Sequence, residues 1–161
     1  QRRRNHGNSP KKAAEGVAML VNIMMGVLAM AISVVVHTLG LIGVTHSISR
    51  VTSRLRVHGH RSRIIAMVTT ATGIFGLLFV EVAIWALFYL ALGTVDDLET
   101  ALYFSAVTFS TLGYGDLVPS HEWRVFSALE GVVGLLMIGW STAYLTAAGL
   151  RVGPFRAGEH F

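Results

Sequence analysis

The distribution of charge along this chain constrains its fold more than any other feature. Residues 16–49 contain no Asp, Glu, Lys or Arg. A helix needs about 20 consecutive apolar residues to cross a bilayer, so this run exceeds one span but is too short for two spans and a turn. We therefore predict one long transmembrane helix over residues 17–49. The basic segment before it, residues 1–16, is expected to be disordered.

Three more apolar runs follow, and they differ in length. Residues 64–92 and 124–150 are each long enough to cross a bilayer as a helix. Residues 98–109 are not, because about 12 residues rise only about 18 Å, roughly half of the membrane. The pattern predicts an all-α membrane protein. Three transmembrane helices are expected, with a re-entrant helix and a loop between the second and the third.

The composition agrees with a membrane protein and excludes several functions. The chain is 53% hydrophobic and 14% charged, with a mean hydropathy of +0.59, whereas soluble domains average about 25% charged residues. The absence of Cys excludes disulfides, thiolate metal sites and cysteine nucleophiles. No nucleophile–base pair or phosphate-binding loop is present, and His58 and His60 have no third metal ligand nearby. We therefore predict neither an enzyme nor a cofactor.

The loop at residues 110–116, with the sequence STLGYGD, carries the clearest functional signal. Backbone carbonyls at membrane depth must be satisfied or must line a cavity that holds water or ions. Gly113 and Gly115, on either side of Tyr114, can adopt a positive φ at little steric cost, so successive carbonyls can point the same way. Four such strands around one axis would stack oxygen rings that replace an ion's hydration shell. A lone Gly-x-Gly would also fit a surface turn.

The run TLGYGD at residues 111–116 resembles the signature of the potassium-channel selectivity filter, with Leu112 where valine is commoner. The neighbouring stretches LYFS (102–105) and DLVP (116–119) are similar to the pore region of small bacterial potassium channels. The resemblance covers about residues 64–150 and leaves one extra N-terminal transmembrane helix. It implies an outer helix, a pore helix, a filter and an inner helix, at residues 64–92, 98–109, 110–116 and 124–150.

The resemblance also implies a role for each filter residue. K⁺ would be the permeant ion, and its ligands would be the backbone carbonyl oxygens of Thr111, Leu112, Gly113 and Tyr114. The tyrosine side chain would point away from the axis and tether the filter to the pore-helix layer. The remaining positions would begin the strand, turn it and form the outer mouth, in the order Ser110, Gly115 and Asp116. Symmetric closure is the norm for homo-oligomers, and the resemblance implies a homotetramer in a lipid bilayer.

Two acids lie within the predicted spans and are candidates for filter support. In some bacterial relatives an acid stands four residues before the filter threonine, but here that position is Val107. Glu81 and Glu130 lie roughly 16 Å and 10 Å below the outer ends of their spans, level with the pore helix. A charge at the bilayer centre costs on the order of 3 kcal/mol or more, so each acid should be protonated or hydrogen-bonded and face protein. We hypothesise that Glu130, and secondarily Glu81, support the filter.

Glycine and polar residues inside the spans each have two interpretations. A helix-interior glycine costs about 1 kcal/mol relative to alanine, so Gly131 and Gly134 should serve either close packing, which we favour, or a gating hinge. The spacing of Gly139, Ala143 and Ala147 suits tight helix contact. Two polar residues of the first span are expected to be satisfied by a neighbouring helix, although the ionisable one also remains a functional candidate; they are Asn22 and His37.

The connection before the last span is acidic, whereas the connection between the first two spans is basic. The acids, Asp96, Asp97, Glu99, Asp116 and Glu122, would concentrate cations at an outer mouth or cap the pore helix. The positive-inside rule places residues 50–63 and the tail 151–161 in the cytoplasm. With the filter facing outward, three spans leave the basic N-terminus outside, against its own charge.

These observations predict a potassium-selective channel of a bacterial inner membrane that conducts passively. A weakly selective monovalent cation channel remains an alternative because of Leu112 and Val107, and a non-conducting membrane scaffold subunit is a second alternative. The basic clusters have no soluble domain to present them, so no nucleic-acid partner is expected. No span carries Arg at every third position, which argues against a voltage sensor.

Overall fold

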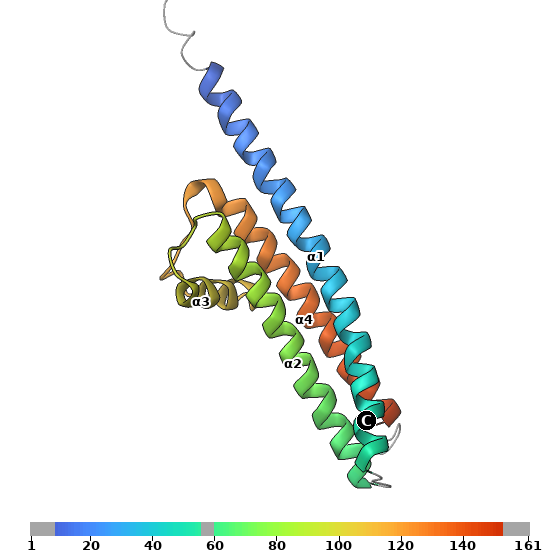
Figure 1. The fold of residues 1–161 in the computed structure, drawn as a ribbon. Coiled ribbons are helices and arrows are strands. Elements are labelled where there is room, and N and C mark those ends of the chain that lie inside the picture. Colours follow the sequence, from blue (N-terminus) through green and yellow to red (C-terminus); the bar gives the residue numbers. More distant parts are fainter. Residues whose placement is uncertain (1–8, 56–59, 153–161) are drawn as a thin grey trace, which may run out of the picture.

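The computed structural model describes residues 9–55 and 60–152, and its ordered elements there are all helices (Figure 1). The described residues form no strand, which confirms the all-α prediction. In chain order the elements are α1 (Ser9–Leu55), α2 (His60–Ala91), α3 (Leu98–Phe109), the short 3₁₀ helix η1 (His121–Trp123) and α4 (Arg124–Val152).

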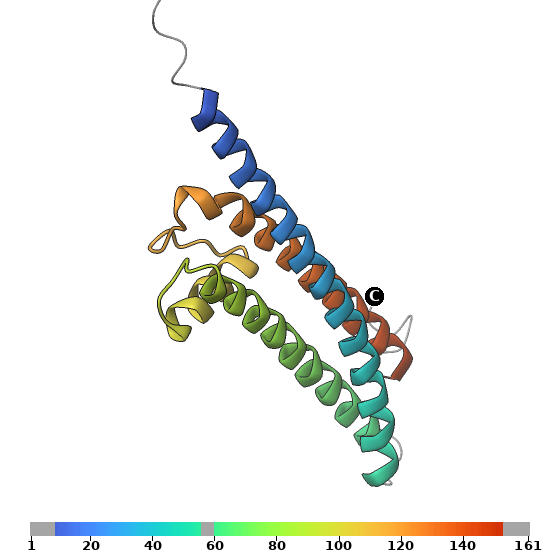
Figure 2. The ribbon, with the colours of Figure 1, turned by 45° about the horizontal axis from the view of Figure 1, so that its top comes forward.

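Three of these helices have the length and composition of membrane spans, as predicted. The qualifying segments within the described residues are Lys12–Val51, Arg61–Ala91 and His121–Arg151. Figures 1 and 2 show α1, α2 and α4 as long neighbouring rods, with α3 beside one end of α2 and α4. The C-terminal end of α1 and the start of α2 lie at the opposite end. This arrangement places the 110–116 loop on the same side of the bundle as α3.

The N-terminal part of α1 differs from the sequence-based expectation. Residues 9–16, which were expected to be disordered, form the first turns of α1. Ala13 and Ala14 are strong helix formers, and extending an existing helix avoids the cost of a new nucleus. The transmembrane helix therefore projects beyond α2 and α4 at this end (Figure 2). Residues 1–8 of the predicted basic segment lie outside the described residues.

The connection between the first two spans is shorter than the expected 50–63. The first span continues as helix to Leu55 and the second begins at His60. Arginine is a good helix former, so both helices extend into the basic cluster before they end. Residues 56–59, including His58, lie outside the described residues, as do residues 153–161 of the predicted tail.

The main apolar core lies where α2, α3 and α4 meet. It is rich in aromatic side chains: the ring centroids of Tyr89 and Phe104 are 4.8 Å apart, and those of Trp85 and Phe126 are 5.0 Å apart. Each such aromatic pair adds about 0.5–1.5 kcal/mol beyond burial alone. Phe109, the last residue of α3, is buried in the same cluster. The short helix is thus held by the two longer ones at its middle, through Phe104, and at its C-terminal end.

Close packing attaches α1 to the rest of the bundle. A Cβ atom built at Gly40 would lie 2.7 Å from Leu77 Cδ2, and one at Gly73 would lie 2.8 Å from Val44 Cγ2. Glycine at such positions allows two helices to approach closely. These contacts join α1 to α2 along the half of the bundle farther from α3, where Leu41, Ile74 and Leu77 form a second apolar cluster.

Polar contacts join α1 to α4 as well. The amide of Asn22 donates to the backbone carbonyl of Glu122, just before α4. Nearer the other end, Thr45 Oγ1 lies 2.6 Å from the hydroxyl of Tyr144. The amide nitrogen of Asn22 is therefore satisfied by a neighbouring segment, whereas its Oδ1 is buried without a hydrogen-bond partner among the described residues, so the prediction holds only for the nitrogen.

Candidate functional site

The candidate site begins at the N-terminus of α3, which Asp97 caps. The carboxylate of Asp97 accepts hydrogen bonds from the backbone N–H of Thr100 at 2.9 Å and from its hydroxyl at 2.6 Å. These bonds satisfy one of the unpaired donors at the start of α3 and place a negative charge at its positive end. The same contacts hold the pKa of Asp97 below its usual range. Two functions were considered for the acidic connection, and one of them, the capping of α3 by Asp97, is therefore present.

Glu130 of α4 connects α3 to α2. Its Oε1 lies 2.6 Å from the Ser105 hydroxyl on α3, and its Oε2 accepts a hydrogen bond from the Tyr89 hydroxyl on α2. The Tyr89 hydroxyl also lies 3.2 Å from the hydroxyl of Ser127. Glu130, Tyr89 and Ser105 are completely buried. This network holds the middle of α3 against both flanking spans.

The number of hydrogens in this network favours a protonated Glu130. The Ser105 oxygen lies 2.9 Å from the backbone carbonyl of Val82 as well as 2.6 Å from Glu130 Oε1. A serine hydroxyl carries one hydrogen and can donate it to only one acceptor. If Glu130 carries a proton on Oε1, both short contacts become hydrogen bonds and no net charge is buried. The geometry therefore agrees with the prediction that this acid is protonated or hydrogen-bonded and faces protein.

The loop that follows α3 has an alternating backbone. Thr111, Gly113 and Gly115 have φ values of 60°, 58° and 76°. Positive φ at the two glycines confirms the sequence-based expectation, whereas positive φ at Thr111 was not anticipated. For a β-branched residue this conformation is rare and costs on the order of 1–3 kcal/mol.

Backbone hydrogen bonds hold the start of the loop in this conformation. The Val107 carbonyl accepts from the backbone N–H groups of Leu112 at 3.0 Å and Gly113 at 3.3 Å. The N–H of Thr111 donates to Thr108 at 3.0 Å. The last turn of α3 therefore determines where the loop begins and in which direction it leaves the helix.

The outer end of the loop is tethered to α3 by a pair that the sequence analysis missed. The Tyr103 hydroxyl donates to Asp116 Oδ2 at 2.6 Å. This bond lowers the pKa of Asp116, so the carboxylate stays ionised into the acidic range. The resemblance assigned a tether to Tyr114, whose side chain is 67% exposed in the single chain, and that assignment stays a prediction. Leu112 is 55% exposed, so two large side chains of the loop face outward from the bundle.

The second candidate for filter support, Glu81, contacts α1, and its support of the filter stays a prediction. Both carboxylate oxygens of Glu81 are hydrogen-bonded to Nδ1 of His37, at 3.2 and 3.3 Å. Glu81 is therefore satisfied by α1 rather than by α3 or the loop. Counting residues locates Glu81 along its helix, but it does not decide toward which neighbouring helix the side chain turns.

The two glycines of α4 have different surroundings. A Cβ atom at Gly134 would lie 2.7 Å from the carbonyl carbon of Phe109 and 2.8 Å from its Cα, whereas one at Gly131 would lie 3.6 Å from the Thr108 carbonyl oxygen. Gly134 therefore permits the end of α3 to rest on the backbone of α4. The packing interpretation fits Gly134, and the hinge interpretation of both glycines stays a prediction.

Several residues of the site were not found from the sequence. Tyr89, Ser105 and Tyr103 supply the hydroxyl groups that satisfy Glu130 and Asp116. A buried acid needs hydroxyl partners, so the need for such residues could have been inferred. Their identity could not, because each lies at least 13 positions from the acid it contacts.

Comparison with known families supports a channel domain in this part of the chain. Residues 75–150, from the middle of α2 through α3 and the loop into α4, match the family model described as "Ion channel". No curated protein and no solved structure matches the chain. Together with three helices of membrane-spanning length, the match supports a multi-pass membrane protein with an ion-permeation function in general. Helix α1 precedes the matched range.

Proposed function

We propose that this chain forms a homotetrameric potassium-selective channel that conducts K⁺ passively across a bacterial inner membrane. The observation that carries the proposal is the positive φ at Thr111, Gly113 and Gly115, within a TLGYGD run at the end of a half-membrane helix. A strand of this kind lets consecutive carbonyl oxygens line one side. The match of residues 75–150 to an ion channel family supports the same conclusion.

In the proposed mechanism four loops surround one axis, and their oxygens replace water around the ion. The carbonyl groups of residues 111–114 would bind dehydrated K⁺ in successive rings, and the Thr111 hydroxyl would lie at the inner entrance. The C-terminal end of α3 carries the partial negative charge of the helix dipole and would favour a cation nearby. No cofactor or covalent chemistry is needed for this function.

Four chains are proposed because one chain leaves the loop incomplete. Leu112 and Tyr114 are exposed by more than half in the single chain, and neighbouring copies would cover them. Closed symmetric rings are the usual form of homo-oligomers. Asp116, whose low pKa keeps it ionised, would then contribute a ring of negative charge that attracts cations to the outer mouth.

The Glu130 network supports a positioning role in this mechanism. Its contacts with Ser105 and Tyr89 fix α3 relative to both spans, and α3 in turn sets the start of the filter strand. We propose that Glu130 supports the filter in this indirect way, through the pore helix. The basic ends of α1, α2 and α4, including Arg50, Arg61 and Arg151, would face the cytoplasm.

The test is ion flux from purified protein in liposomes, measured together with its oligomeric state. With unequal K⁺ and Na⁺ on the two sides, the proposal predicts a reversal potential close to the equilibrium potential of K⁺, from a tetramer. Gly113→Ala is the matched variant: its Cβ would meet no atom within 4 Å in the chain, but its φ is +58°. It should reduce flux or selectivity without unfolding the bundle.

Two other outcomes would replace the proposal. Equal permeation of K⁺ and Na⁺ would establish a weakly selective monovalent cation channel, an alternative that Leu112 and Val107 keep open. Absence of flux from intact tetramers would favour a non-conducting membrane scaffold subunit. A chain that remains monomeric in the bilayer would contradict the shared-axis mechanism itself.

A further inference from the structure

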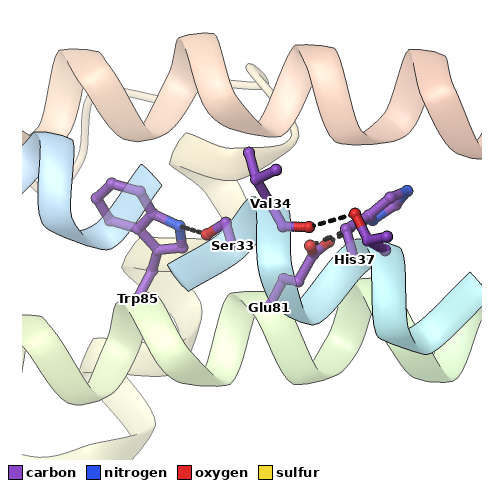
Figure 3. Close-up of polar contacts among 6 residues, drawn as sticks. Ser33, Val34, His37, Glu81 and Trp85 are labelled. Atoms are coloured by element: carbon purple, nitrogen blue, oxygen red, sulfur yellow. Dashed lines mark hydrogen bonds and ion pairs between the residues drawn. The ribbon is translucent and has the colours of Figure 1, made fainter. Parts of the chain in front are cut away.

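A second buried site joins α1 to α2, away from the filter loop. Figure 3 shows His37 of α1 and Glu81 of α2 facing each other between the two helices. The His37 Nδ1 atom lies 3.2 Å from Oε1 and 3.3 Å from Oε2 of Glu81, and both side chains are completely buried. Two ionisable groups in direct contact within membrane-length helices have no part in the proposed conduction path.

The net charge of this pair depends on one proton. A neutral histidine beside an ionised glutamate would bury a charge of −1, which is costly in a membrane interior. One added proton makes the pair neutral, either as imidazolium with carboxylate or as imidazole with carboxylic acid. In the first form both ring nitrogens carry hydrogen. In the second, Nδ1 accepts a hydrogen from the acid, so the hydrogen of the neutral ring must be on Nε2.

The neutral pair therefore always presents an N–H group at Nε2. This nitrogen points away from Glu81 (Figure 3) and is buried with no hydrogen-bond partner among the described residues. The ring that packs against the imidazole is the indole of Trp140 on α4, with centroids 5.1 Å apart and planes inclined by 43°. An N–H group or an imidazolium is attracted to an aromatic ring. Loss of the proton would remove that hydrogen and leave a negative pair beside α4.

No other titratable group in the described part of the chain contacts this pair. On α1 the adjacent polar residues are Ser33, which accepts from Trp85 (Figure 3), and Thr38, which donates to the Val34 carbonyl. Neither hydroxyl titrates in the accessible pH range. From α2 the facing group is Glu81, and from α4 it is the uncharged indole of Trp140. Glu130, the acid within the span of α4, is hydrogen-bonded to Tyr89 and Ser105 instead.

We propose that His37 and Glu81 form a proton-binding site, and that the bound proton fastens α1 to α2 and α4. When α1 is packed against α2 and α4, the His37–Glu81 pair binds one proton more than a neutral histidine and an ionised carboxylate would together. When the helices separate and water reaches the pair, histidine releases that proton above its ordinary pKa of about 6.5. Docking is thus favoured below that pH and weakens by up to tenfold per pH unit above it, since one proton is linked to it.

This inference goes beyond conduction and can be tested without ion flux. The protonation state of His37 can be read from ¹⁵N NMR of histidine-labelled full-length protein in lipid between pH 5 and pH 9. The His37 signals are assigned by their loss in His37→Asn. We expect a protonated Nε2 at pH 6, and we expect its deprotonation to shift to a different pH in Glu81→Gln, which retains a hydrogen-bonding side chain. A His37 ring with bare Nε2 throughout this range would overturn the proposal.

The coupling to α4 has its own readout. In the Trp85→Phe, Trp123→Phe background, Trp140 is the remaining tryptophan, and its fluorescence reports the charge and contact of the adjacent imidazole. The fluorescence should change with pH at the same midpoint as the His37 resonance, and this change should be absent in His37→Asn. Thr38→Val, which alters an exposed neighbour on α1, should retain it. The link to α4 would be contradicted if Trp140 fluorescence did not change as His37 titrates. It would also be contradicted if Thr38→Val removed this change as fully as His37→Asn does.

Discussion

Replacing Gly134 by alanine should disturb the start of the 110–116 loop far more than the same change at Gly131. The new Cβ at position 134 would lie 2.7 Å from the carbonyl carbon of Phe109, whereas ordinary contacts begin at 3.4 Å. The two backbones would have to separate by at least 0.7 Å, the difference between these distances. Because the obstacle is backbone rather than a side-chain end, no rotamer change can relieve it.

The expected difference in the free energy of unfolding between the two variants follows from two opposing effects. Alanine in place of a helix-interior glycine stabilises by about 1 kcal/mol, and this gain is common to both positions. Overpacking at Gly134 costs about 1–3 kcal/mol, whereas a Cβ at Gly131 would lie in ordinary contact, 3.6 Å from the Thr108 carbonyl oxygen. We therefore expect the free energy of unfolding of Gly134→Ala to be about 1–3 kcal/mol lower than that of Gly131→Ala.

The assay pairs thermal unfolding with K⁺ and Na⁺ flux for both variants. Displacement of Phe109 should shift Thr111, two residues later. In the potassium-selective channel proposed above, Gly134→Ala should therefore lose part of its preference for K⁺ over Na⁺, while Gly131→Ala keeps both its stability and its ion preference. Equal stability of the two variants would refute the packing argument. A Gly131→Ala protein with normal stability but altered open probability would instead identify that glycine as a hinge.

Three further predictions concern the residues around the filter. Glu130→Ala should lower the free energy of unfolding by about 2–5 kcal/mol, because it leaves a cavity and unpaired hydroxyls on Tyr89 and Ser105. Glu130→Gln should be tolerated, since an amide can donate to one hydroxyl and accept from the other; severe destabilisation by Gln would indicate an ionised Glu130. The cap at Asp97, whose pKa is lowered by Thr100, should stabilise α3 above the ordinary Asp value of about 3.9 and lose this effect as the pH falls through the lowered value. Unfolding measured against pH should therefore show an acid-dependent difference that Asp97→Ala removes. Tyr103→Phe should raise the pKa of Asp116 toward its ordinary value, which a carboxyl NMR titration detects; an unchanged value would mean that the Tyr103 hydroxyl is not its main cause.

Some local features of the site could be predicted because their causes are local. Gly113 and Gly115 were expected at positive φ from residue type alone, and they are found there. Thr111 was not, because its side chain disfavours that conformation. Hydrogen bonds from the two residues after it to Val107 compensate for the strain, and such bonds exist only once α3 has formed.

The two acids within the predicted spans show what could not be predicted from the sequence. Helical rise placed Glu81 and Glu130 at similar depths, and a similar function was therefore suggested for both. In the structure Glu130 turns to Tyr89 and Ser105, whereas Glu81 turns to His37. Depth along a helix follows from counting residues, but the rotation of one helix against another follows from packing. The partner of a buried acid is set by that rotation.

By itself the sequence determined three membrane-length helices, a half-length helix between the second and third, and a glycine-containing loop after it. These follow from the length of apolar runs and from the conformational freedom of single residues, which depend on neighbours in the chain. Only the tertiary structure decided that α1 packs on both α2 and α4, that Gly134 touches Phe109, and that His37 meets Glu81. The physical reason is that each contact joins segments far apart in sequence, and close packing selects one relative orientation of the helices from many that their apolar surfaces would permit.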